Sequence, residues 1–156
     1  MEERLDLAKQ LTLGLLQRMG VETEVGGFLR EGELCIEVKS DKEGILIGKN
    51  GRTLDSLQFL INRMMNKELK EPVRIVLDIN HYKERRADFL RKMAIRLGEN
   101  AKRMGKEITI GPFNAHDRRI IHITLQENPS LKTQSLGEGE MKRIKIIPTK
   151  KEGERV

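Results

Sequence analysis

The sequence has one cysteine, no secretory signal and no long apolar run. A single thiol, Cys35, excludes an internal disulfide and any zinc site built from several cysteines. No apolar run approaches the roughly 18 residues that a membrane span requires, so membrane insertion is not expected. The chain starts with an acidic, amphipathic stretch instead of a signal peptide. These absences together predict a cytoplasmic protein.

Aromatic residues and catalytic groups are also scarce. The chain has four Phe, one Tyr and no Trp, whereas a protein that holds nucleobases chiefly by stacking would be expected to have more. Its three histidines stand without supporting cysteines, and the sequence shows no pattern of paired carboxylates or of a Ser/His/Asp set. We therefore expect no enzymatic activity, no metal site and no cofactor.

Charge, in contrast, is abundant and unevenly distributed. Charged residues make up 35% of the 156 residues, above the roughly 25% that is usual, and the net charge is +6. Residues 1–80 have a charge balance of −2, and residues 81–156 have a balance of +8. This asymmetry indicates that the second half faces a polyanion, although a well-solvated lysine-rich surface would have the same composition.

The hydrophobic pattern of residues 1–80 predicts the order α-β-β-α-α-β. An apolar stripe with three- and four-residue steps predicts a first helix that ends at Gly20. Two segments that meet around Gly32 predict a hairpin. A short helix before residues 48–51, an amphipathic helix after them, and a strand opened by Pro72 complete the order.

The pattern of residues 81–150 predicts the order α-β-α-β-β. A long basic helix begins at His81 and is stopped by Gly105, and a short strand follows. Asn114 is the predicted N-cap of a helix that ends near Gln126, although the β-branched residues within that segment favour a strand. The two final strands are expected at residues 131–136 and 143–147.

The most informative tetrapeptide is Gly48-Lys49-Asn50-Gly51. Glycine permits positive φ angles and leaves no Cβ in the way of an approaching phosphate. Lys49 adds a positive charge, and Asn50 tolerates the left-handed conformation and donates hydrogen bonds. The helix that follows, which starts near Arg52, directs its free N–H groups and positive dipole end to the same place. These features predict a site for a sugar-phosphate backbone.

A loop of this composition has two other interpretations. A nucleotide-binding P-loop needs four residues between its first glycine and the Gly-Lys pair, followed by Ser or Thr. Only three residues separate Gly44 from Gly48, and Asn50 stands at the Ser/Thr place, so we reject a P-loop. A bare G-x-x-G is also common as an ordinary turn that leads into a helix.

Residues 44–54 have the sequence Gly-Ile-Leu-Ile-Gly-Lys-Asn-Gly-Arg-Thr-Leu. Within the order α-β-β-α-α-β, this segment resembles a KH domain of the bacterial type. The resemblance covers roughly residues 1–80. It implies a type II KH fold, in which the GXXG loop clamps about four nucleotides of single-stranded nucleic acid. The implied nucleic-acid-binding residues are Gly48, Lys49, Asn50, Gly51 and Arg52.

Arg118 and His122 are four residues apart, so they share one face of either a helix or a strand. Arg118 offers a planar fork of donors for a phosphate or a base edge. His122 can donate to a phosphate, stack, or become charged near neutral pH. Pairs with this spacing are usually ordinary surface residues, and a structural alternative has His122 fixing its helix against the sheet.

Residues 114–126 have the sequence Asn-Ala-His-Asp-Arg-Arg-Ile-Ile-His-Ile-Thr-Leu-Gln. They are followed by the turn Ser135-Leu-Gly-Glu138 and by the basic strand at 142–147. Together these segments resemble an R-3-H domain, a family named for its Arg-x-x-x-His motif. The resemblance implies a domain that binds single-stranded nucleic acid through Arg118 and His122. The residues predicted to widen the basic face are Arg119, Lys142, Arg143 and Lys145.

The sequence therefore predicts an α+β chain with a KH domain at 1–80, an R-3-H domain at 81–150 and a disordered tail at 151–156. The long basic helix follows the KH strand without a flexible linker, so we expect a limited range of domain orientations. One strand of RNA that touches both domains would gain avidity. Arg85 and Arg86 are predicted to line its path, although a solvated helix face is an equal alternative.

The order of the two domains resembles the bacterial Jag family, also called SpoIIIJ-associated or KhpB-type RNA-binding proteins. The resemblance implies that the partner is single-stranded RNA, with single-stranded DNA as an alternative, and that the role is post-transcriptional regulation. It also implies a small single-KH partner protein or a homodimer. Many members have an N-terminal Jag domain, which we do not expect here. The alternative function is a protein-interaction adaptor or a ribosome-associated assembly factor.

Overall fold

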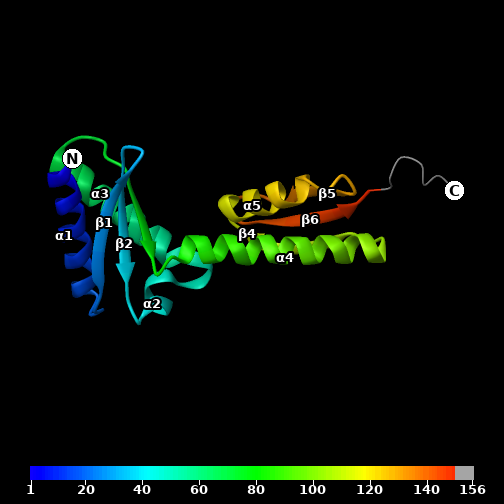
Figure 1. Ribbon diagram of the computed structural model, residues 1–156, viewed down its shortest axis with the longest axis horizontal. Helices are drawn as coiled ribbons and strands as arrows, with labels where there is room; N and C mark the ends of the chain where they lie inside the picture. Colours follow the sequence, from blue (N-terminus) through cyan, green and yellow to red (C-terminus); the bar gives the residue numbers. More distant parts are fainter. Residues whose placement is uncertain (150–156) are drawn as a thin grey trace. The chain divides into compact units, whose positions relative to one another are not determined.

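The computed structural model describes residues 1–149, which divide into two compact units, residues 1–83 and residues 84–149 (Figure 1). The predicted disordered tail, 151–156, lies outside the described residues. Each unit has its own three-stranded sheet and its own hydrophobic core, so the predicted α+β class is confirmed. Among residues 1–149, no helix has the length and apolar character needed to cross a membrane.

The first unit has the predicted order α-β-β-α-α-β. Strand β2 lies in the centre of its sheet, antiparallel to β1 and parallel to β3, and helices α1 and α3 pack against the sheet and against each other. The strand expected to open at Pro72 begins three residues later, at Ile75. The elements are α1 (Glu2–Arg18), β1 (Glu24–Arg30), β2 (Glu33–Lys39), α2 (Glu43–Ile47), the 3-10 turn η1 (Lys49–Gly51), α3 (Arg52–Leu69) and β3 (Ile75–Ile79).

Helix α3 presents three distinct faces. Its buried face consists of Leu54, Leu57, Ile61 and Met65, which have the three- and four-residue steps of an amphipathic helix. These side chains join the core formed by the buried residues of β2 and β3. The opposite face is exposed, and a third face lies along β3. The pattern fixes which residues of α3 remain available to a ligand.

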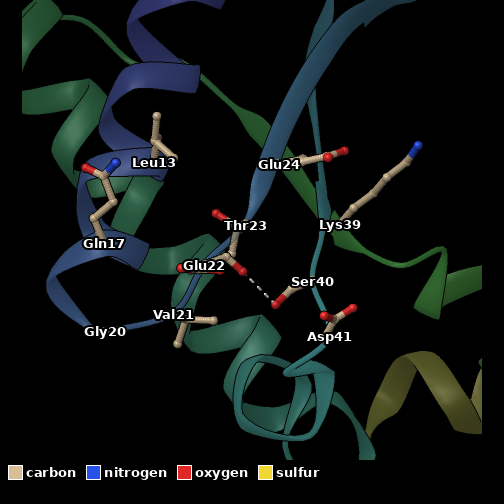
Figure 2. A pocket seen from close by; sticks show the side chains of 10 residues that line it. All are labelled: Leu13, Gln17, Gly20, Val21, Glu22, Thr23, Glu24, Lys39, Ser40 and Asp41. Carbon is tan, nitrogen blue, oxygen red and sulfur yellow. Dashed lines mark hydrogen bonds between the residues drawn. The ribbon is translucent and has the colours of Figure 1, made fainter.

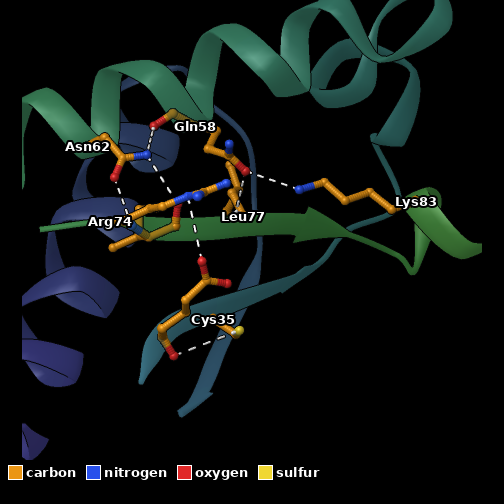
Figure 3. Close-up of polar contacts among 8 residues, drawn as sticks. Cys35, Gln58, Asn62, Arg74, Leu77 and Lys83 are labelled. Carbon is orange, nitrogen blue, oxygen red and sulfur yellow. Dashed lines mark hydrogen bonds and ion pairs between the residues drawn. The ribbon is translucent and has the colours of Figure 1, made fainter. Parts of the chain in front are cut away.

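The third face of α3 covers the outer edge of β3. Side-chain amides spaced four residues apart accept hydrogen bonds from alternate backbone N–H groups of that edge, as Figure 3 shows for Gln58 and Asn62. A strand edge satisfied in this way offers no free donors to another strand. The amides also hold α3 at one rotation about its axis. The bonds run from Val73 N to Asn66 Oδ1 (2.8 Å), from Ile75 N to Asn62 Oδ1 (2.7 Å) and from Leu77 N to Gln58 Oε1 (3.0 Å).

The second unit has the predicted order α-β-α-β-β, and its sheet is antiparallel with the strand order β4-β6-β5. The segment after Asn114 is a helix and not a strand. Asn114 Oδ1 accepts a hydrogen bond from Asp117 N at 2.8 Å, so the predicted N-cap is confirmed. The elements are α4 (Tyr82–Met104), whose first two residues belong to the first unit, β4 (Ile108–Phe113), α5 (Ala115–Gln126), β5 (Leu131–Leu136) and β6 (Lys142–Pro148).

Candidate nucleic-acid interface

The Gly48–Gly51 turn joins α2 to α3 through three residues with positive φ angles. Gly48 has φ 71° and ψ −174°, a combination that is essentially restricted to glycine. Asn50 has φ 56°, the left-handed conformation that the sequence predicts for it, and Gly51 has φ 81°. The turn therefore depends on its glycines for its shape. Hydrogen bonds from Gly51 N to Gly48 O (3.4 Å) and from Arg52 N to Lys49 O close it.

Both glycines also make room for neighbouring parts of the protein. A Cβ at Gly48 would overlap the Thr53 hydroxyl, and a Cβ at Gly51 would lie 2.8 Å from Cε1 of the Tyr82 ring. The sequence interpretation had assigned this space to an approaching phosphate. The structure shows instead that the space is occupied by the chain's own side chains, which support the turn from within.

The outer side of the turn is exposed and cationic. Lys49 and Arg52 are exposed, Asn50 is partly exposed, and Gly51 is buried beneath them. The turn precedes an 18-residue helix, so the positive end of the α3 dipole adds to the two side-chain charges. A phosphate at this place would meet two flexible cations and the N-terminal end of a helix.

The start of α4 is bound to the same region of the first unit. Lys83 Nζ donates to Gln58 Oε1 at 3.0 Å, and Lys83 N donates to Asp78 Oδ1 at 3.3 Å (Figure 3 shows the first bond). Burial lowers the pKa of Lys83, and the nearby carboxylates of Asp78 and Asp55 oppose that shift. Together with Tyr82 against Gly51, these contacts fix the glycine turn from behind.

The predicted Arg118/His122 pair lies on α5 and faces β5. Arg118 Nε donates to Phe113 O at 3.2 Å, and Arg118 Nη1 donates to Ser135 Oγ at 3.2 Å. His122 Nε2 lies 3.0 Å from the same Ser135 Oγ, and His122 Nδ1 is hydrogen-bonded to Thr133 Oγ1. The Ser135 hydroxyl therefore joins the two motif residues, and Thr133 is a member of the site that the sequence did not identify.

His122 has a structural role, which is the alternative that its sequence context also allows. Both ring nitrogens bond to hydroxyl groups of β5, so the ring fastens α5 to the sheet. Burial lowers the pKa of His122, and the neighbouring Arg118 guanidinium lowers it further. A neutral ring satisfies both hydroxyl partners, because one ring nitrogen donates and the other accepts.

The stability of the second unit should consequently depend on pH. A folded pKa below the unfolded value of about 6.5 means that the unfolded chain binds more protons, so stability is complete above that pH and falls as the pH falls toward the folded pKa. We expect the urea midpoint to decrease between pH 7.5 and 5.5. In His122→Gln, which does not titrate, this decrease should be smaller. An equal decrease in both proteins would contradict the assignment.

Arg86 is placed differently from the prediction. Its Nη2 lies 3.0 Å from Asp117 Oδ2, and the two side chains are only 16% and 6% exposed. The guanidinium also lies over the Phe89 ring, 5.6 Å from its centroid. Arg86 therefore joins α4 to the first turn of α5 and is not an open cation for a nucleic acid. Arg85, its neighbour, is exposed.

The remaining basic residues of the predicted site do not all share one surface. Lys142 pairs with Phe113 across β4 and β6, which brings it near Arg118. Arg143 alternates with the buried Ile144, so it projects from the opposite face of the sheet. Arg119 is exposed on α5. The compact part of the second site is therefore formed by Arg118, His122 and Lys142.

A separate hollow of about 660 Å³ lies between the end of α1 and the ends of β1 and β2 (Figure 2). The sequence analysis did not identify it. Its charged lining consists of Glu22, Glu24 and Asp41 against one cation, Lys39. This excess of carboxylates repels a polyanion, so the hollow is unsuited to the sugar-phosphate backbone.

Comparison with known proteins identifies both units. Residues 6–78 match the family described as KhpA/KhpB, KH domain, and residues 88–148 match the R-3-H domain family. The proteins named RNA-binding protein KhpB from Clostridium symbiosum, Lactiplantibacillus plantarum and Bacillus subtilis are 38%, 31% and 32% identical to the chain. These alignments cover 88%, 80% and 70% of the chain but 61%, 39% and 53% of the relatives' own lengths.

The fold and the two motif sites define a protein that combines a KH domain with an R-3-H domain. More specifically, the chain belongs to the KhpB family, as the sequence resemblance predicts. Neither matched domain family is an enzyme family, which agrees with the predicted non-catalytic character. The chain spans between 39% and 61% of the length of these three relatives.

Proposed function

We propose that the chain binds single-stranded nucleic acid, primarily RNA, and acts in the cytoplasm as a non-catalytic post-transcriptional regulator. The observation that carries this proposal is the exposed, cationic Gly48–Gly51 turn at the positive end of α3. The names of the KhpB relatives, which describe them as RNA-binding proteins, support it. Single-stranded DNA is the alternative ligand.

The turn contacts the backbone of the strand and not its base sequence. Lys49 and Arg52 supply charge, and the rigid support from Thr53 and Tyr82 holds the turn in one shape before the ligand arrives. Phosphate contacts position a nucleic acid and carry no sequence information directly. We therefore expect binding at the turn to have little base preference and a strong dependence on salt.

Arg118 provides the second contact. Its Nε and Nη1 are used within the protein, and among residues 1–149 its Nη2 has no acceptor within hydrogen-bonding distance. A guanidinium held on two sides keeps its remaining donors in a fixed direction, which suits a phosphate oxygen. Lys142, whose backbone pairs with that of Phe113, adds a cation nearby. A strand that reaches both sites gains avidity from the covalent link between the units.

We expect Arg118→Ala to weaken RNA binding and to reduce the salt dependence. Loss of one phosphate contact on a single strand lowers the slope of log K against log salt by about 0.7. Arg118→Lys, which keeps the charge but not the fork, should retain the slope. Fluorescence anisotropy titrations at several salt concentrations measure both quantities. An unchanged slope in Arg118→Ala would contradict a contact between Arg118 and a phosphate, provided that urea unfolding shows the variant to be folded.

Binding to labelled single strands distinguishes the proposal from a protein-interaction adaptor. The other alternative, a ribosome-associated assembly factor, would also bind RNA and differs in its target. The wild-type chain should bind RNA dodecamers at low salt and release them as salt is raised, because cations on the protein displace condensed counterions. Duplex RNA of the same length is the control and should bind more weakly. Absence of binding to any single strand at low salt would favour the adaptor.

A small single-KH protein or a second copy of the chain is proposed as the protein partner from the family resemblance.

A further inference from the structure

Helix α4 buries one side and exposes the other. The buried side consists of Leu90, Ala94, Gly98 and Ala101, which follow one another at steps of four, four and three residues. The three of them that have side chains join the core of the second unit. Figure 1 shows the 23-residue helix as the long green ribbon of that unit. Because its apolar stripe packs inside the unit, the exposed side of α4 is largely charged.

One edge of the exposed side has cations that are paired with acidic residues of the same helix. Arg91 Nη2 lies 2.6 Å from Asp88 Oδ1, and Lys102 Nζ lies 3.4 Å from Glu99 Oε1. Ile95, which is 55% exposed, lies on this edge between the two pairs. Paired charges of opposite sign largely cancel for a ligand in salt solution, so this edge attracts a polyanion only weakly.

The other edge combines an aromatic ring with cations. Phe89, Lys92, Arg96 and Arg103 follow one another at steps of three, four and seven residues, which places them on one face, and this set is called the α4 stripe. All four residues are exposed, and within residues 1–149 neither Lys92 nor Arg96 has a carboxylate at ion-pair distance. At about 1.5 Å per residue the stripe extends over about 21 Å. The α4 stripe therefore presents uncompensated positive charge to a ligand.

The Phe89 ring is held from one side by a buried ion pair. The Arg86 guanidinium lies 5.6 Å from the ring centroid, and Arg86 Nη2 lies 3.0 Å from Asp117 Oδ2. The Arg86 side chain is only 16% exposed, whereas Phe89 is 57% exposed. The ring consequently keeps most of its surface open to solvent while its position is fixed. A flat group that is fixed before binding loses little conformational entropy when a ligand stacks on it.

We propose that the α4 stripe binds a segment of single-stranded nucleic acid, with one base stacked on Phe89 and phosphates beside Lys92 and Arg96. The inference rests on the proposed function, because the ligand is the same kind of strand that the glycine turn binds. The turn and Arg118 are proposed to contact phosphates, and the stripe adds stacking to them. Since an aromatic ring accepts any base, the stripe increases affinity with little base preference.

Charge and burial favour a nucleic acid over other anionic partners. A helix that lies on a membrane needs a wide apolar face, and the apolar face of α4 is buried within the second unit. The centre of a protein interface is depleted in charged residues, whereas Phe89 has Lys92 and Arg96 on its own face. A strand of flat bases and regularly spaced phosphates complements both the ring and the cations.

Helix α4 contains matched controls for both parts of the stripe. Ile95 and Phe89 are apolar residues of nearly equal exposure on opposite edges of one helix, so Ile95→Ala is the control for Phe89→Ala. Arg91→Ala/Lys102→Ala removes two cations, as Lys92→Ala/Arg96→Ala does, but from the edge with ion pairs. The sequence has no tryptophan, so Phe89→Trp and Ile95→Trp each introduce a single fluorescent reporter.

The test is binding of a labelled RNA dodecamer to the full chain at several salt concentrations. We expect Phe89→Ala to bind about tenfold more weakly, the loss typical of one stacked base, and Ile95→Ala to bind as the wild type does. Lys92→Ala/Arg96→Ala should lower the slope of log K against log salt by about 1.4, since each lost phosphate contact lowers it by about 0.7. Arg91→Ala/Lys102→Ala should leave the slope unchanged. The dodecamer should quench Phe89→Trp and not Ile95→Trp.

Four results would overturn the inference. Phe89→Ala could bind as tightly as Ile95→Ala, the two double variants could lose slope equally, or the two tryptophan reporters could be quenched equally. Quenching of Phe89→Trp by polyglutamate and not by RNA would identify an acidic protein as the partner. If Phe89→Ala fails to fold in urea titrations, Phe89→Trp keeps a ring and still gives the answer. Absence of RNA binding by the wild-type chain would instead refute the proposed function, so the two failures are distinguished.

Discussion

Changing Lys49 and Asn50 together to aspartate is expected to lower the affinity for single-stranded RNA by on the order of 100-fold at low salt. The substitution removes one cation and puts two carboxylates on the exposed side of the turn, where the phosphates are proposed to lie. The φ of Asn50, 56°, is one that aspartate also tolerates, so the turn should keep its shape. Anisotropy titration with an RNA tetramer measures the loss.

A control variant with the same change in net charge is available at the acidic hollow. Gln17→Asp/Lys39→Asp also adds two carboxylates and removes one cation, at exposed positions beside the acidic hollow. It should retain most of the wild-type affinity. Equal losses in the two variants would show that only the overall charge matters, and full binding by the Lys49→Asp/Asn50→Asp variant would contradict the assignment of the turn.

Replacing Arg86 with alanine is expected to destabilise the second unit by about 2–3 kcal/mol. Removing one partner of a buried ion pair leaves the other charge without compensation, and Asp117 is only 6% exposed. The value lies just below the roughly 3–5 kcal/mol typical of a fully buried pair, because Arg86 itself keeps 16% of its side chain exposed. Urea denaturation followed by circular dichroism measures the change.

Two further variants test the physical cause of that loss. Arg96→Ala removes an exposed arginine from the same helix and should change stability by no more than about 0.5 kcal/mol. Adding Asp117→Asn to Arg86→Ala removes the uncompensated charge and should recover part of the stability. If Arg86→Ala and Arg96→Ala were equally stable, the ion pair would make no measurable contribution to the free energy of unfolding. Arg86 would then again be a candidate for nucleic-acid contact.

Local patterns in the sequence were sufficient for the element order and for the glycine turn. The positive φ at Asn50 and the cap at Asn114 depend on residues within a few positions of each other, so residue type alone indicates them. The placement of Arg118 and His122 on one face also follows from spacing, whichever element carries them. These features need no knowledge of how distant parts of the chain pack.

Long-range contacts could not be predicted in the same way. Nothing near Gly51 indicates that Tyr82 fills the space beside it, and nothing near Arg86 indicates that Asp117 is its partner. The motif alone suggests that His122 contacts a ligand. Its structural role depends on Thr133 of β5, which is distant in the sequence and bonds to its ring. The amides of α3 do leave a signal, since Gln58, Asn62 and Asn66 recur every fourth residue, but their role depends on the edge of β3 beside them.

The central claim is most directly tested by amide spectra of the isotopically labelled chain during titration with a single-stranded RNA tetramer. The account predicts that the largest shifts occur at Gly48 to Arg52 and in the first turn of α3, and that added salt reverses them. Shifts that cluster instead around the hollow between Glu22 and Asp41, with the glycine turn unaffected, would contradict it.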